Sequence, residues 1–221
     1  MALPTTVWES VQAFLPVLLE GALVSAQVAA GGLVVALAGG LILALLVQSA
    51  NRPLRWLGIA YVELIRGTPA LAQLFILYFG LADYGLRLPP MAAAIIGLGM
   101  NGSAYLAEVF RAGILAVNRG QTEAAFSLGM TPAVTMQYVV LPQAVRVMLP
   151  PMCNYAVQLL KDTSLVSAVA APEIMFRARN LVMETYDSMT IYLLVAAIYL
   201  AISIPLSHVA NSLQQRLGAR A

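Results

Sequence analysis

Charge is scarce in this chain. Charged residues make up 10% of the 221 positions and hydrophobic residues 61%, whereas an average soluble domain carries about 25% charged residues. The net charge is only +2, so there is no strong basic field to favour nucleic acid as a partner. These figures exclude an ordinary soluble globular protein and indicate a membrane protein that binds no nucleic acid.

Residues that build enzyme and metal sites are equally scarce. The chain has one cysteine, Cys153, and one histidine, His208, so an intrachain disulfide is excluded and no metal-ligand cluster is visible. The only lysine, Lys161, lacks the preceding glycine pattern of a phosphate-binding loop. We therefore expect no cofactor, no metal and no ATPase activity through that loop. Cys153 and His208 are interpreted as packing or interfacial residues.

Long apolar stretches are abundant. A bilayer crossing needs about 20 apolar residues, and the sequence predicts an all-α membrane domain covering residues 1–221. Because no Lys or Arg precedes Arg52, the first stretch is interpreted as a retained helix rather than a signal peptide. The five predicted transmembrane helices are residues 21–47, 57–81, 91–110, 136–160 and 189–209.

Arginine placement predicts the orientation. Cytoplasmic loops carry an excess of positive residues. With the N-terminus outside and the C-terminus in the cytoplasm, the predicted cytoplasmic parts hold Arg52, Arg55, Arg111, Arg119, Arg216 and Arg220. The outside parts then hold only Arg87, Arg177 and Arg179. This orientation puts residues 119–136 in the cytoplasm, between the third and fourth transmembrane helices.

Small residues recur along the first transmembrane helix. Gly32, Ala36 and Gly40 are four residues apart, and such spacing lets helix backbones approach closely in lipid. They pack either against other helices of the same chain or at a subunit interface.

The polar segment 119–136 reads as two short helices around a turn. Residues 120–128 favour a helix, Gly129 is a typical helix stop, and Thr131-Pro132 is a typical helix start. Apolar side chains such as Phe126 and Leu128 remain on it. From the residues alone, the segment is either a docking element or a loop that packs on its own bundle.

The stretch EAAFSLGMTPAVTMQYVVLP resembles the EAA motif of ABC importer permeases, which depend on a binding protein. Val139 replaces the usual isoleucine of that motif. The matching residues are Glu123, Ala124, Ala125, Gly129, Leu141 and Pro142. Four further stretches, ELIRGTPALAQLFILYFGL, AYLAEVFRAGI, LPQAVRVMLPPMCN and LKDTSLVSAVAAPEI, resemble the polar amino acid branch of that family.

The resemblance implies the smaller type I importer-permease fold in the bacterial inner membrane. It implies a permease that moves a polar amino acid or similar zwitterion by alternating access; a compatible solute of the ectoine type is the alternative. The implied partners are a pair of ATP-binding cassette subunits, a second permease that is identical or related, and an extracytoplasmic solute-binding protein, all within membrane lipid. The EAA segment is implied to seat in the ATPase. A channel or ion-coupled carrier is the rival class, but neither inverted repeats nor an ion site is visible.

Ionisable residues at membrane depth are the candidate solute contacts, because they are costly there. Lys161, Asp162, Thr163 and Ser164 follow a helix that its prolines are predicted to break. They offer one charge of each sign, either to a zwitterion or to an internal anchor.

Two further positions carry the same kind of alternative. Glu63 and Arg66, predicted near the cytoplasmic start of the second transmembrane helix, are three residues apart. They can form a structural pair or contact the solute. Glu108 and Arg111 repeat this spacing, and we expect a structural pair there. Arg146, between Pro142 and Pro150, lines the path or pairs with a carboxylate.

Overall fold

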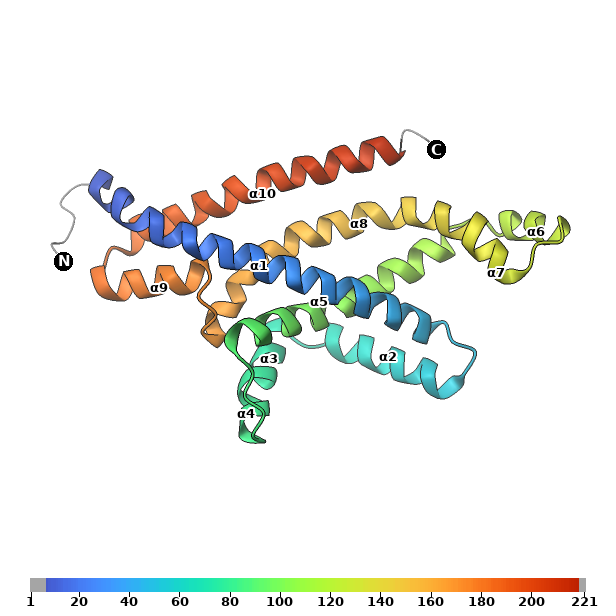
Figure 1. The fold of residues 1–221 in the computed structure, drawn as a ribbon, viewed down its shortest axis with the longest axis horizontal. Helices are drawn as coiled ribbons and strands as arrows, with labels where there is room; N and C mark the ends of the chain where they lie inside the picture. Colours follow the sequence, from blue (N-terminus) through green and yellow to red (C-terminus); the bar gives the residue numbers. More distant parts are fainter. Residues whose placement is uncertain (1–6, 219–221) are drawn as a thin grey trace.

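The computed structural model describes residues 7–218, and every regular element within them is a helix (Figure 1). Arg220, used in the orientation argument, lies outside the described residues. Helix α1 begins the bundle and α10 ends it, and the short helices α6 and α7 lie at one extremity of the long axis. The N-terminal end of α1 and helix α9 lie at the opposite extremity.

Helix α1 spans Val7–Val47, 41 residues. At 1.5 Å per residue this is about 61 Å, roughly twice the thickness of a bilayer's hydrocarbon core. The helix ends where the sequence predicted, but it begins 14 residues before position 21. Its extra turns are stabilised by packing, because Phe14 and Leu18 are buried in a cluster with Ile174 and Ile191.

Helix α5, Pro90–Leu115, packs closely along α1. A Cβ at Gly40 would approach the Leu106 side chain to 2.9 Å, and one at Gly99 would approach Val35 to 2.5 Å. Gly32 and Ala36 are buried on the same face of α1. The small residues of α1 therefore pack against this chain's own α5, as one of the two interpretations predicted.

The predicted crossing 57–81 is not one continuous helix, because the chain bends by 107° inside it. Helix α2, Arg52–Arg66, ends at Gly67, and helix α3, Ala70–Phe75, begins after Pro69. A π-helical turn, Ile76–Gly80, and the short α4, Leu81–Asp83, follow. Proline disfavours a helical conformation in the residue before it, and here it directs the chain away from α2.

Helices α6, Arg119–Ser127, and α7, Pro132–Thr135, lead through a π-helical turn, Met136–Val140, into α8, Leu141–Asp162. The sequence predicted that prolines break this last helix. That prediction is wrong, because Pro150 and Pro151 lie inside one continuous helix. Proline's fixed φ is itself helical, so it removes hydrogen bonds without forcing the chain out of the helix.

The C-terminal part begins with a 3-10 turn, Thr163–Val169, followed by α9, Ile174–Thr185, and α10, Ser188–Gly218. By length and apolar composition, three described helices can cross a membrane, namely α1, α5 and α10, or four if α2 and α3 form one bent crossing. Helix α8 carries Arg146, Lys161 and Asp162. The count of five crossings and the orientation of the termini stay predictions.

Candidate functional site

The segment 119–136 folds as a helix, a turn and a helix. The Asn118 side chain accepts a hydrogen bond from Gly120 N at 2.8 Å and begins α6. Gly129 ends it with φ +79°, a left-handed conformation that glycine adopts without steric cost. Thr131 then caps α7, its Oγ1 accepting from Val134 N at 3.5 Å. The predicted stop and restart are confirmed.

The six motif residues do not share one environment. Ala125 is 4% exposed and packs inward, whereas Glu123, Ala124 and Gly129 are exposed. Leu128 is the most exposed apolar side chain of the segment, at 83%. The remaining two motif residues, Leu141 and Pro142, are exposed at the start of α8, beyond the π-helical turn. The segment thus exposes both a carboxylate and a large apolar side chain.

The segment is also fixed to its own bundle. A hollow of about 280 Å³ lies between the end of α5 and the two short helices, and Thr122, Phe126 and Met136 contribute to its wall. Gln143 of α8 donates to Gln121 Oε1 at 3.4 Å and to Val139 O at 2.8 Å. One side-chain hydrogen bond therefore joins α6 to the start of α8.

The cluster at Lys161–Ser164 divides between two directions. Lys161 is exposed and lines a hollow of about 480 Å³ with polar residues of α10, including Tyr199, Ser203 and His208. Asp162 is half-buried and accepts from Gln158 Nε2 at 2.8 Å.

The two hydroxyl residues of the cluster, Thr163 and Ser164, also differ in burial. Thr163 is fully buried and its hydroxyl donates to Leu160 O at 2.7 Å, so this hydroxyl hydrogen is used within the helix. Ser164 is half-buried, and its carbonyl accepts from the Ser167 hydroxyl at 2.8 Å.

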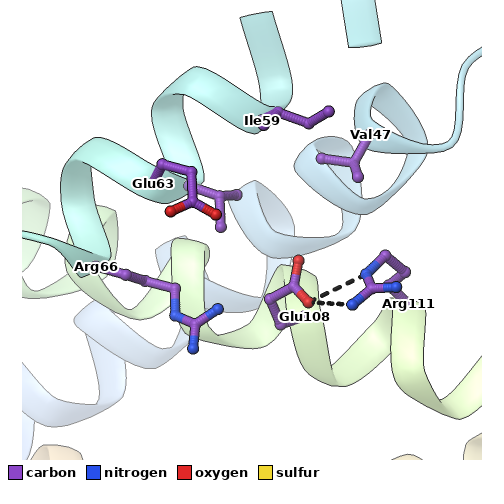
Figure 2. Close-up of a pocket in the computed structure, with 7 residues that line it drawn as sticks. Val47, Ile59, Glu63, Arg66, Glu108 and Arg111 are labelled. Carbon is purple, nitrogen blue, oxygen red and sulfur yellow. Dashed lines mark hydrogen bonds and ion pairs between the residues drawn. The ribbon is translucent and has the colours of Figure 1, made fainter. Parts of the chain in front are cut away.

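A third hollow, of about 390 Å³, collects four charged side chains (Figure 2). Glu63 and Arg66 of α2 turn toward α5, where Glu108 and Arg111 lie. Glu108 and Arg111 form the expected pair, with Arg111 Nη2 2.6 Å from Glu108 Oε2. Within the described residues no ion pair joins Glu63 to Arg66, because Arg66 ends α2 at the bend and extends over α5.

Arg146 is the remaining candidate at membrane depth. It is exposed on α8, one turn before Pro150, and lines none of the hollows described above. The structure therefore brings Glu63 and Arg66 together with Glu108 and Arg111, and places Lys161 at a different hollow.

Sequence reasoning missed a buried carboxylate, Glu173. It is 0% exposed and caps α9, accepting from Met175 N at 2.9 Å and Phe176 N at 2.7 Å. Tyr199 of α10 donates to it at 3.2 Å. Burial raises the pKa of the Glu173 carboxyl, against hydrogen bonds that favour its ionised form. Its place before an apolar run was the only sequence signal, and glutamate is not a typical cap.

A stacked tyrosine pair was also missed. Tyr105 of α5 and Tyr155 of α8 lie with ring centroids 5.2 Å apart and planes at 23°. The Tyr155 hydroxyl covers Gly102 so closely that a Cβ there has no room. The pair joins residues 50 positions apart, and one sequence gives no signal for such a contact.

Known proteins resemble this chain over most of its length. Residues 36–221 match the family described as "Binding-protein-dependent transport system inner membrane component". The probable glutamine ABC transporter permease protein GlnM of Bacillus subtilis (strain 168) is 41% identical, over 83% of this chain and 87% of that protein. The L-cystine transport system permease protein TcyB of the same organism is 38% identical, over 95% and 91%.

A solved structure agrees with the fold. The crystal structure of an amino acid ABC transporter with histidines has a chain with a TM-score of 0.91 and 34% identity, covering 98% of this chain and all of that one. The all-helical importer-permease fold predicted from the motifs is confirmed. This chain belongs to the family of binding-protein-dependent transport system inner membrane components.

Proposed function

We propose that this chain is the membrane subunit of an ATP-driven importer for a polar amino acid or similar zwitterion. The carrying observation is its likeness, across 83% and 95% of its length, to permeases named for glutamine and for L-cystine. The solute crosses the inner membrane by alternating access, between states open to the outside and to the cytoplasm. The N-terminus lies outside, the C-terminus lies in the cytoplasm, and residues 1–221 form one membrane domain.

The segment 119–136 is the coupling element of this proposal. Glu123 makes a polar contact in a groove of an ATP-binding cassette subunit, and Gly129 sets the angle between α6 and α7. The exposure of Glu123 and of Leu128 supports this role, as does the hydrogen bond from Gln143 to Gln121. ATP is hydrolysed by a pair of such partner subunits, because the chain carries no phosphate-binding loop of its own.

The solute contacts are assigned to the charged groups at membrane depth. Lys161 binds the carboxylate and Asp162 the ammonium of the zwitterion, with Ser164 adding a hydrogen bond. Lys161 and Asp162 follow each other along α8 and carry opposite charges, as the two charged groups of a zwitterion require. Thr163 supports the site from within, because its hydroxyl is bonded to the helix.

The lower path includes Glu63 and Arg66, whose charges are not joined to each other, and Arg146 on α8. The chain works with a second permease, either another copy or a related chain, and with an extracytoplasmic binding protein that delivers the solute.

Uptake into proteoliposomes tests the solute class. The ATPase–permease complex is reconstituted with its binding protein, and entry of radiolabelled L-glutamine, L-cystine and L-histidine is measured with and without ATP. ATP-dependent entry of at least one of them is expected, and Asp162→Asn is expected to weaken the apparent affinity with assembly intact. ATP-dependent entry of ectoine alone would contradict the amino acid assignment.

A further inference from the structure

Two hollows beside α5 share two charged side chains. Arg66, at the end of α2, and Glu108, on α5, line the hollow of about 390 Å³ shown in Figure 2. The same two side chains line a second hollow of about 480 Å³ between α5 and α8. The Arg66 guanidinium and the Glu108 carboxylate therefore lie at the boundary between the two hollows.

These charges lie along the side of the bundle rather than at its end, with Arg66 exposed and Glu108 partly buried. Gly58 of α2 contacts Leu46 and Val47 at the end of α1. Arg66 is eight residues farther along α2, about 12 Å deeper at 1.5 Å per residue. The Tyr61 hydroxyl donates to Met100 O of α5 at 3.1 Å and holds α2 in this place. Charges at such depth are costly unless a partner or a water-filled path receives them.

The ion pair between Arg111 and Glu108 uses only one oxygen of the Glu108 carboxylate. Arg111 donates to Glu108 Oε2 from Nε at 3.0 Å and from Nη2 at 2.6 Å. Both bonds reach the same oxygen, so the other oxygen of Glu108 keeps its acceptor capacity. In the described part of the chain, Arg66 makes no ion pair with either Glu63 or Glu108. One guanidinium and one carboxylate oxygen thus face the hollows.

The second hollow is suited to a small side chain. Its wall is mostly apolar, formed by Val109, Ala112, Val147 and Pro151, with the ring of Tyr105 at its edge. Its volume of about 480 Å³ falls in the range of roughly 300–1,000 Å³ that small-molecule sites occupy. An amino acid bound at Arg66 and Glu108 therefore has room for its side chain.

One face of α8 joins this place to the proposed solute contacts. Val147 and Pro151 line the hollow, Tyr155 stacks on Tyr105, and Gln158 donates to Asp162. These α8 residues are spaced by three or four positions, so they share one face of the helix. Asp162 lies on one side of the stacked tyrosine pair, and the second hollow lies on the other.

We propose that Arg66 and Glu108 form an inner solute site, on the cytoplasmic side of the Tyr105–Tyr155 pair. Arg66 binds the carboxylate through two parallel hydrogen bonds, a geometry that guanidinium favours. The available oxygen of Glu108 accepts from the ammonium, and the side chain enters the hollow between α5 and α8. This inference rests on the proposed function, and it adds a second station that the solute occupies after Asp162.

A phosphatidylethanolamine headgroup shares this chemistry, because it also carries an ammonium and an anion. The continuity along α8 with Asp162 favours the amino acid. The test therefore uses nanodiscs of phosphatidylglycerol alone, which contain no ammonium headgroup, and repeats the measurement in discs that contain phosphatidylethanolamine.

The experiment compares Arg66→Gln with Arg52→Gln in the complete ATPase–permease complex. Arg52 is the same residue type on the same helix, exposed at its first position. Binding of radiolabelled L-glutamine, L-cystine and L-histidine is measured without the binding protein, and uptake with it. Arg66→Gln is expected to remove one of two binding phases and to lower maximal uptake at least about tenfold, a loss of about 1.4 kcal/mol of interaction.

Two readouts separate solute contact from a structural role. In Arg66→Gln, the external solute concentration that gives half-maximal uptake is expected to stay within about twofold of the wild-type value, because the outer contacts are intact. A tenfold change in that concentration would require a loss of about 1.4 kcal/mol of binding free energy. Asp162→Asn is expected to affect the other binding phase. Arg66→Lys keeps the charge without the bidentate geometry, so it is expected to restore part of the uptake if Arg66→Gln assembles poorly.

Each outcome decides between named alternatives. Binding and uptake equal to those of Arg52→Gln would overturn the inner site and leave the proposed function standing. A wild-type complex that neither binds nor takes up any of the three amino acids would overturn both. If Arg66→Gln changed only the retention of phosphatidylethanolamine, with amino acid binding as in wild type, the ligand would be a headgroup and the inner solute site would be wrong.

Discussion

Two turns in this chain share a Gly, Thr and Pro, and they are built differently. Gly129, Thr131 and Pro132 separate α6 from α7, and Gly129 takes φ +79°. Gly67, Thr68 and Pro69 separate α2 from α3, and Gly67 takes φ −82°. The first turn depends on a left-handed backbone. The second depends on side chains that replace the missing helical bonds.

The second turn is fastened by Gln73 and Thr68. Gln73 Nε2 lies 2.7 Å from Ile65 O and 3.0 Å from Thr68 O. The Thr68 hydroxyl donates to Leu64 O at 2.8 Å. The carbonyls of Leu64 and Ile65, which the end of α2 leaves without helical partners, thus accept hydrogen bonds from side chains. This bend is therefore held by side-chain hydrogen bonds, whereas the turn at Gly129 depends on a glycine in the left-handed region.

The largest expected effect on transport is at the turn that contains Gly129. Gly129→Leu places a side chain at φ +79°, which costs roughly 1–2 kcal/mol for an L residue, and changes the angle between α6 and α7. We expect ATP-driven uptake to fall at least about tenfold, since about 1.4 kcal/mol corresponds to tenfold. Uptake by reconstituted complexes is the measurement.

Gly129→Asn is the matched control, because asparagine tolerates the left-handed region better than leucine. Space around the Gly129 Cβ position is open, so the backbone conformation alone is tested. Equal uptake by the leucine and asparagine variants, both near wild type, would contradict the role given to this turn.

At the bend between α2 and α3 the expected effect is on stability rather than on transport. Gln73→Leu removes the bonds to Ile65 and Thr68 and the bond that its Oε1 accepts from Asn101 at 3.1 Å. We expect a loss of roughly 2–3 kcal/mol, because several bonds are lost and partners are left unsatisfied. Thermal unfolding of the purified complex is the measurement.

Gln48→Leu serves as its control, because Gln48 makes one bond, to Ala44 O at 3.0 Å, at the end of α1. The account requires a clearly larger shift in unfolding temperature for Gln73→Leu. A shift no greater than that of Gln48→Leu would mean that proline and glycine alone hold the bend.

The smallest effect is expected at the cap of α7. Thr131→Ala removes the acceptor for Val134 N, and the bond is long at 3.5 Å. A loss of about 0.5 kcal/mol, at the low end for a helix cap, is expected. Hydrogen exchange at the Val134 amide measures it, and Thr131→Ser is expected to behave as wild type. Faster exchange in the serine variant as well would show that the methyl group, rather than the cap, matters.

The two turns also show what one sequence can predict. The turn at Gly129 was predicted because its signals are local, namely a cap, a stop and a proline within a few residues of polar chain. The bend at Gly67 was missed because the hydropathy on both sides is continuous, and Gln73 acts through side-chain bonds that periodicity does not report. The break expected at Pro150 and Pro151 did not occur, because proline removes hydrogen bonds but keeps a helical φ.

In the candidate site, too, local contacts were predicted from the sequence and long-range contacts were missed. Pairing of Glu108 with Arg111 was predicted from their spacing and is present. The same spacing failed for Glu63 and Arg66, because the helix ends there and Arg66 extends over α5. The stacking of Tyr105 on Tyr155 depends on how whole helices pack, so the arrangement of the path could not be read from the order of the residues.

The central claim is that the segment 119–136 couples this chain to an ATPase. The most direct test is to purify the tagged chain from its native host in gentle detergent and to identify the bound proteins by mass spectrometry. The account predicts an ATP-binding cassette subunit with the wild-type chain and much less of it with Glu123→Arg, which reverses the charge of an exposed side chain. A related permease in the sample would identify a core of two different chains. If no related permease is present, the core consists of two copies of this chain. No ATPase under conditions that preserve other membrane complexes, or equal amounts with both forms, would contradict the coupling role of the segment 119–136.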